Sequence, residues 1–271
     1  MRKFVATTAI ALTTLSGHAF AEGLHDQFWG ELSYFYPTIT STARLDATAT
    51  NRPGSSITLE DELDLADRKG TPYFSLGMRI AQNWRIEFEY YKLDRSSSKS
   101  LSRQIDWGDS TYPVGVQIDS TFDTTVYRLT GGYSFYKTPV AEAGAALGLH
   151  VTDFTTELSG QASGPGGTTA FQREANDALV PLPTLGLYGA YAFNDQFQVR
   201  GRVDYLTLKY DQYDGSLVNF LVAFDWRFSK NWGVGAGYRY VDYKLNADDP
   251  DFRGEVNYKF KGPTLFLTAG F

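Results

Sequence analysis

The sequence contains no cysteine among its 271 residues, which excludes disulfide bonds and a lipid attached to a thiol. Beyond its N-terminus it also lacks long hydrophobic runs: the mean hydropathy is -0.30, whereas each membrane-spanning helix needs about 20 consecutive apolar residues. Histidine occurs only three times, and the formal net charge of -6 argues against a nucleic-acid partner. These absences exclude a bundle of transmembrane helices and a domain held together by disulfides.

The N-terminus has the pattern of an export signal. Arg2 and Lys3 precede an apolar stretch over residues 4–15, and the small-residue motif Ala19-Phe20-Ala21 follows. This pattern predicts a signal peptide over residues 1–21 with cleavage after Ala21. An N-terminal membrane anchor is the alternative. Residues 22–271 are expected to form a single domain.

Aromatic residues are abundant and recur at one position of a repeated hairpin pattern. Tyrosine occurs 18 times and phenylalanine 19 times. After short polar turns, alternating runs resume at Trp84, Phe197 and Trp232, in RIAQNWRIEFEYY, YAFNDQFQVRGRVDY and WRFSKNWGVGAGYRY. Aromatic side chains at one level of a sheet are typical of a girdle at a membrane interface, here the periplasmic one. In a soluble β-sandwich the same three residues would instead lie in the core.

Period-2 alternation divides the chain into ten predicted strands, with eight as the alternative if the first hairpin is misassigned. The strands cover residues 27–45, 70–80, 84–95, 117–136, 141–157, 180–193, 197–210, 216–228, 232–245 and 255–271. Turns at 81–83, 137–140, 194–196 and 229–231 are short, whereas the polar connections at 46–69, 96–116, 158–178, 211–215 and 246–254 are mostly long. The pattern predicts an all-β fold: a closed antiparallel up-and-down transmembrane β-barrel with short periplasmic turns and long extracellular loops.

The chain ends in the middle of an alternating strand. Leu265, Leu267 and Ala269 alternate with mostly small or polar residues up to the final Phe271. Because an unpaired apolar edge would be sticky, the last strand is expected to pair with the first and close the barrel.

With this ending, the export signal and the aromatic residue after each turn, the chain resembles bacterial outer-membrane β-barrel proteins, a group that includes the small OmpA-, OmpW- and opacity-like barrels. The resemblance implies the outer membrane of a Gram-negative bacterium, with membrane lipid and lipopolysaccharide as its surroundings. It also implies that Leu265, Leu267, Ala269 and Phe271 form the signal read by the barrel-assembly machinery. The resemblance concerns architecture and leaves the function open.

Charged residues fall largely on the strand face opposite the apolar one, and most lie near a predicted periplasmic turn. The basic set is Arg79, Arg85, Arg128, Arg200, Arg202, Arg227 and Arg239, and the acidic set is Glu31, Glu87, Glu89, Glu142, Asp204 and Asp225. Charges at membrane depth must be paired or hydrated. The two sets therefore predict a network in the lower half of the lumen, either a plug of ion pairs or the filter of a narrow pore.

Enzyme chemistry is not expected, and neither a cofactor nor a metal is. Export would leave His25, which precedes the first predicted strand on the periplasmic side, and His150, which has Gly148 rather than an acid two residues before it and matches no hydrolytic motif. His150 is expected to join the lumen network. An outer-membrane enzyme that processes lipid or peptide remains a second alternative, after the narrow porin-like channel. The main expectation is a non-enzymatic protein whose surface loops have structural or interaction roles.

Two acidic clusters occupy predicted loops. The first contains Glu60, Asp61, Glu62, Asp64 and Asp67, and the second contains Asp248, Asp249 and Asp251. Clustered carboxylates can bind Ca²⁺, but neither spacing is that of an EF-hand, so both are expected to be solvated. The apolar residues Leu59, Leu63 and Leu65 predict that the first loop packs over the barrel mouth as a short helix or cap.

Overall fold

The computed structural model describes residues 24–163, 169–210, 213–248 and 253–271. The predicted signal peptide lies outside these residues. Among them, no helix is long and apolar enough to cross a bilayer.

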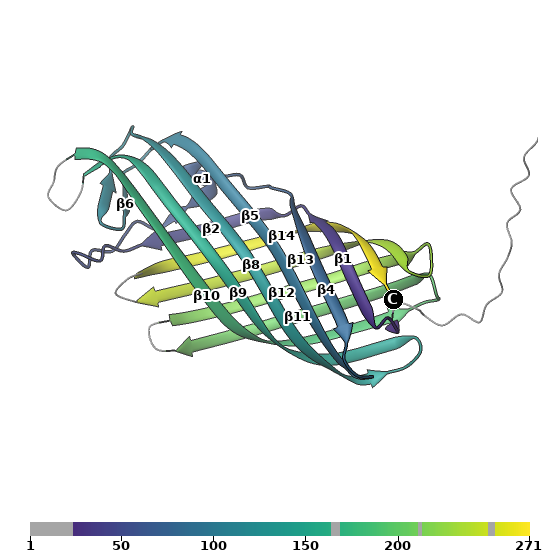
Figure 1. The fold of residues 1–271 in the computed structure, drawn as a ribbon. Coiled ribbons are helices and arrows are strands. Elements are labelled where there is room, and N and C mark those ends of the chain that lie inside the picture. The colour runs from purple at the N-terminus through teal and green to yellow at the C-terminus, as the bar shows by residue number, and fades with distance from the viewer. Residues whose placement is uncertain (1–23, 164–168, 211–212, 249–252) are drawn as a thin grey trace, which may run out of the picture.

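Ten strand positions form the wall, each antiparallel to the next, and β14 pairs back with β1 (Figure 1). The wall strands are β1 (Phe28–Phe35), β4 (Thr71–Arg79), β5 (Trp84–Ser100), β8 (Gln117–Lys137), β9 (Ala141–Ser163), β10 (Thr169–Ala192), β11 (Phe197–Tyr210), β12 (Tyr213–Arg227), β13 (Trp232–Asp248) and β14 (Arg253–Gly270). The predicted barrel with ten strands is confirmed, and the alternative of eight strands is wrong.

The first predicted strand is interrupted. It forms β1 and then β2 (Thr38–Leu45), separated by Tyr36 and Pro37. Both halves pair with β14, β1 through Phe35 opposite Thr264 and β2 through Thr38 opposite Lys261. Proline cannot donate to a strand ladder, which explains why the strand breaks there.

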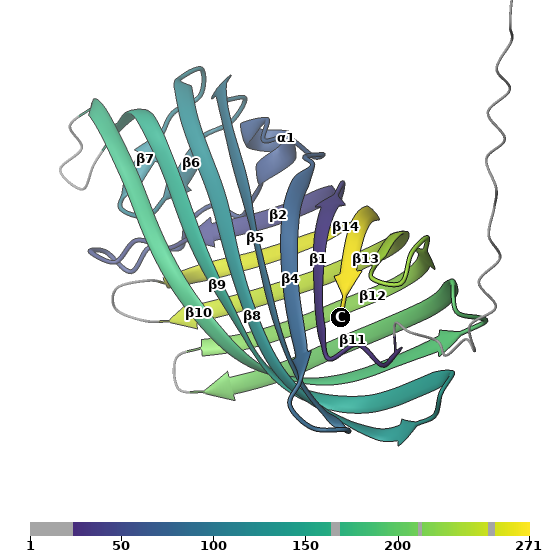
Figure 2. The same cartoon turned by 45° about the vertical axis from the view of Figure 1, so that its right-hand side comes forward.

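The two ends of the barrel differ in their connections. Short turns join β4 to β5, β8 to β9, β10 to β11 and β12 to β13, and we call this the short-turn end. At the opposite, long-hairpin end, β5, β8, β9 and β10 run far beyond their neighbours (Figures 1 and 2).

Two of the predicted loops are largely strand. Of the segment 158–178, the described residues 158–163 and 169–178 form the ends of β9 and β10, and 96–116 contains the end of β5 together with the small hairpin of β6 (Ile105–Trp107) and β7 (Ser110–Tyr112). The loop prediction relied on polarity and was wrong because these strands have a polar outer face. Their inner face remains apolar, with Trp107, Tyr112 and Leu158 buried.

The long-hairpin half has an aromatic and aliphatic core inside the barrel. Phe122 and Phe154 from β8 and β9 pack against Tyr258 and Tyr243 from β14 and β13, with ring centroids 5.4 and 5.1 Å apart. The sequence pattern does not predict this layer. An inward aromatic residue gives the same alternating pattern as one facing lipid, so periodicity alone does not distinguish them.

A folded segment fills the space between β2 and β5, two strands that do not pair. It comprises β3 (Ile57–Thr58) and α1 (Leu59–Leu63). Leu59, Leu63 and Leu65 are buried in the core, which confirms the predicted short helix. Glu60 of this helix is not solvated, contrary to expectation: its Oε2 accepts from the Ser41 backbone N–H at 2.8 Å and its Oε1 from Arg95 Nη1 at 2.5 Å. Glu60 thereby joins β2 to β5.

Candidate functional site

The inward charges of the short-turn half form a connected set of ion pairs. Glu89 of β5 accepts from Arg128 Nη2 at 2.9 Å and from Arg239 Nη2 at 2.6 Å, so one carboxylate joins strands β8 and β13 across the lumen. Both arginines and Glu89 are buried. In the interior each ion pair must offset the cost of desolvating its charges, which requires this kind of multiple hydrogen bonding.

A second carboxylate extends the set towards β11 and β12. Asp204 accepts from Arg128 Nη1 at 2.7 Å, from Arg202 Nη2 at 2.8 Å and from Asn219 Nδ2 at 3.0 Å. The Asn219 side-chain oxygen accepts in turn from Arg239 Nε at 3.1 Å. Asn219 is a member that the sequence analysis missed, since only its inward register on β12 indicated it.

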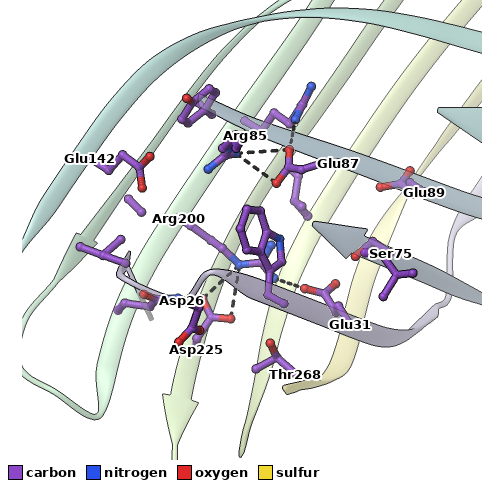
Figure 3. A pocket seen from close by; sticks show the side chains of 18 of the residues that line it. Asp26, Glu31, Ser75, Arg85, Glu87, Glu89, Glu142, Arg200, Asp225 and Thr268 are labelled. Atoms are coloured by element: carbon purple, nitrogen blue, oxygen red, sulfur yellow. Dashed lines mark hydrogen bonds and ion pairs between the residues drawn. The ribbon is translucent and has the colours of Figure 1, made fainter. Parts of the chain in front are cut away.

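Near the short-turn end the pairs link more distant strands. Arg79 of β4 forms a two-pronged contact with Glu142 of β9, at 2.9 and 2.6 Å. Arg200 binds Asp225 with a nitrogen–oxygen distance of 3.1 Å and also donates to Glu31, and Figure 3 shows it between these two carboxylates.

Asp26 completes the balance of charge. It lies just before β1 and pairs with Arg227 of β12. Strand alternation predicts seven inward arginines and six acids; with Asp26 there are seven of each. No period-2 signal could have found Asp26, because it precedes the first strand.

A cavity of about 140 Å³ lies within this set, towards the short-turn end (Figure 3). Arg85 lines it with its guanidinium 3.6 Å from the ring centre of Tyr188 and 5.9 Å from that of Trp29, a cation–π arrangement. Arg85 also pairs with Glu87 at 3.2 Å, and Glu87 accepts from Arg202 Nη1 at 2.6 Å. The cavity walls thus carry guanidinium and carboxylate groups that already pair with each other.

The ion pairs of the short-turn half are in direct contact with the aromatic core of the long-hairpin half. Tyr73 donates its hydroxyl to Glu31 at 2.7 Å, and the Arg239 guanidinium lies 5.4 and 5.2 Å from the rings of Tyr73 and Tyr91. Through the described residues the lumen therefore holds two stacked layers, ion pairs below and packed rings above.

The two histidines among the described residues are far apart in the chain and differ in exposure. His150 is buried on β9 directly opposite Arg128 of β8, while His25 is exposed before β1. Within the described ranges, no group of three or more histidine, aspartate or glutamate side chains is arranged to hold a metal ion. Asp248 pairs with Arg253 at 2.6 Å, and its predicted companions Asp249 and Asp251 lie outside the described residues.

The predicted girdle residues lie on the outside of the barrel. Trp84 packs against Tyr133 with centroids 4.9 Å apart, and Phe197 stacks on Trp226 at 6.5 Å. Trp232 is about half exposed. All three begin a strand at the short-turn end, so the structure brings them to one level of the outer surface.

The four residues of the predicted assembly signal lie on the closing strand. Leu265, Leu267 and Ala269 are on β14, and the Phe271 backbone bonds across the closure: its N–H donates to Phe28 O at 2.9 Å, and its oxygen accepts from Gln27 N at 2.7 Å. Leu265 and Phe271 point outwards and are exposed.

No protein-family model matches the sequence, and no curated protein matches it. Among solved structures, the outer membrane protease OmpT from Escherichia coli is 12% identical with a TM-score of 0.61, over 94% of this chain and 99% of OmpT. Neisserial surface protein A is 12% identical with a TM-score of 0.33, over 90% of this chain and 97% of that one. Ail of Yersinia pestis is 11% identical with a TM-score of 0.33, over 89% and 99%. At such low identity the likeness shows the fold alone, that of a bacterial outer-membrane β-barrel.

Proposed function

We propose that the protein is a closed, non-enzymatic barrel of the outer membrane whose extracellular half is an interaction platform. The observation that carries this is the filling of the lumen by two layers. The lower layer holds seven arginines and seven acids with no excess of one sign, unlike the charge bias that a selective filter uses. The upper layer is packed aromatic and aliphatic side chains.

The outer surface supports placement in a membrane. Apolar residues such as Leu32, Leu147, Leu187 and Leu265 are 57–68% exposed on it. Aromatic residues begin the strands at the short-turn end, and tyrosines such as Tyr127 recur further along. An apolar band between two aromatic levels is typical of transmembrane barrels. Membrane lipid and lipopolysaccharide are the neighbours we propose for this surface, and the barrel-assembly machinery is the proposed reader of the C-terminal strand.

Single-channel recording tests the closed lumen. Refolded protein without residues 1–21 is added to a planar bilayer, and folding is verified by heat-modifiable gel mobility. The wild type is expected to be silent. The matched variant Arg128→Ala removes a side chain that joins Glu89 and Asp204, and it is expected to produce brief openings. Steady openings of the wild type whose size changes in Arg128→Ala would instead make the protein a narrow channel.

A further inference from the structure

The barrel wall is split at the long-hairpin end between β10 and β11. β10 pairs with β9 along its whole length, but it pairs with β11 only from Leu185 to Ala192. Beyond Leu185 the two strands diverge, as both Figure 1 and Figure 2 show. The Leu182 side chain still reaches β12 at the base of the split, since a Cβ added to Gly215 would lie 3.3 Å from Leu182 Cδ2. Residues 169–184 of β10 therefore form a sheet edge.

The register shows which backbone groups face this open edge. Ala192 N donates to Val140 O, on the β9 side, at 2.8 Å. The β9–β10 register is unbroken, so even-numbered residues of β10 bond to β9 and odd-numbered residues face the edge. Pro181 and Pro183 are odd-numbered and have no N–H, so this part of the edge, next to the split, offers no backbone donor to an added strand. From residue 171 to residue 179 the odd-numbered positions keep both N–H and C=O.

The outward side chains of this edge have an ordered chemistry. Phe171 and Leu179 are 64% and 66% exposed, although they lie at the polar, long-hairpin end. Between them the exposed positions are Arg173, Ala175 and Asp177. Read along β10, the series is apolar, basic, small, acidic, apolar. Arg173 donates to Glu157 at 2.7 Å but remains 64% exposed, and a guanidinium has further N–H groups to donate.

We propose that residues 171–179 of β10 are a strand-addition site for an extended segment of an extracellular polypeptide. The segment adds antiparallel, and its backbone bonds to the odd-numbered residues while its alternate side chains meet those of β10. From its N-terminus it presents an apolar residue opposite Leu179, a basic one opposite Asp177, a small one opposite Ala175, an acidic one opposite Arg173 and an apolar one opposite Phe171.

Charge sets the register of this pairing. A slip of two residues leaves both charges of the segment without their partners, and a slip of four brings like charges together. Like charges directly opposite each other destabilise a strand pair. The occupant we propose is a separate polypeptide; the β10 strands of two copies in one membrane point the same way, so two β10 edges cannot pair antiparallel with each other. This inference rests on the proposed function, which places this end outside the cell.

Residues 171–179 of β10, aligned antiparallel to themselves, have the required pattern. A peptide with their sequence therefore serves as the probe. A fluorescent peptide FQREANDAL, identical to residues 171–179, is titrated with the refolded full-length barrel in detergent and followed by anisotropy. The control peptide FQDEANRAL has its two charges exchanged and would place like charges opposite Asp177 and Arg173. We expect it to bind about tenfold more weakly than FQREANDAL.

Two protein variants complete the test. Exchanging the charges of the protein, Arg173→Asp with Asp177→Arg, is expected to reverse the preference between the two peptides. Ala175→Pro removes an edge N–H without touching the β9 side and is expected to abolish binding, with folding verified by heat-modifiable mobility. Equal binding of both peptides, binding unaffected by Ala175→Pro, or no binding of either peptide overturns the proposal. Conductance is recorded on the same preparation, so an open channel would overturn the closed lumen independently of the peptide result.

Discussion

At the scale of single residues, the lumen depends on carboxylates that each hold more than one arginine. Glu89 and Asp204 both contact Arg128, and of these two carboxylates Glu89 also contacts Arg239. Removing one member of a buried set leaves its partners charged and desolvated, which costs more than the net contribution of the pair. Removing one of these buried side chains should therefore cost more stability than removing a member of an exposed ion pair with the same nitrogen–oxygen distance.

The variant Glu89→Ala is expected to destabilise the barrel by about 3–5 kcal/mol, because Arg128 and Arg239 lose their shared carboxylate. Urea unfolding in detergent, followed by tryptophan fluorescence, measures the change. The control is Glu255→Ala: Glu255 lies 4.0 Å from Arg44 on the surface and its removal should change little. Equal losses in both variants would contradict the central role of Glu89.

Glycine gives a second test at this scale. A Cβ on Gly144 would lie 2.2 Å from Tyr188 Cζ, whereas a Cβ on Gly131 meets nothing within 4 Å. Gly144→Ala should therefore destabilise by about 1–3 kcal/mol through overpacking. Gly131→Ala, on the neighbouring strand β8, should be close to neutral. Thermal loss of the compact gel band compares them, and similar midpoints would count against the contact with Tyr188.

At the scale of elements, the segment from β3 to α1 acts as part of the wall. It occupies the place where β2 and β5 do not pair, and Ser97 Oγ of β5 donates to Leu63 O at 2.5 Å. The two splits of the long-hairpin half thus differ: this one is closed by the chain itself, whereas among the described residues the split between β10 and β11 is crossed at its base by the Leu182 side chain.

Loss of the Glu60 contacts should loosen this segment. In Glu60→Ala, Arg95 and Ser41 lose their acceptor, and residues 57–68 are expected to be cleaved several-fold faster in limited proteolysis of the folded barrel. The neighbouring control Asp61→Ala removes an exposed side chain and keeps the backbone oxygen that Lys99 contacts. If both variants are cleaved at the wild-type rate, Glu60 does not hold the segment.

At the scale of the whole molecule, the backbone of the last residue extends the ladder between β1 and β14 that closes the barrel. Phe271→Ala keeps the bonds to Gln27 and Phe28, so the refolded barrel should retain wild-type stability. In cells the same variant should accumulate poorly in the outer membrane if the aromatic side chain is the assembly signal. Deletion of Phe271 removes both features and should impair both readouts. Normal assembly of Phe271→Ala would restrict the role of this residue to closure.

The larger features of the wall could be predicted because they rest on local rules. Residues 197–210 were predicted as a strand, and β11 has those bounds, since a short turn and period-2 alternation delimit it. The ends of β9 and β10 were missed because polarity was taken as a sign of loop. Beyond the bilayer a strand can have a polar outer face. Only the apolar residues of its inner face then indicate in the sequence that the segment is a strand of the barrel.

The sequence by itself determined the class of fold, the number of strands, the outward aromatic level and the inward side of the charges, because alternation and turn chemistry act between neighbours in the chain. Only the tertiary structure decided which arginine meets which acid, that Asp26 enters the lumen, and that the long-hairpin half splits around an aromatic core. Period 2 states which face a side chain occupies, but not what lies across the barrel from it. That depends on strand length, stagger and closure, which bring together residues far apart in the chain, such as Arg227 and Asp26, 201 positions apart.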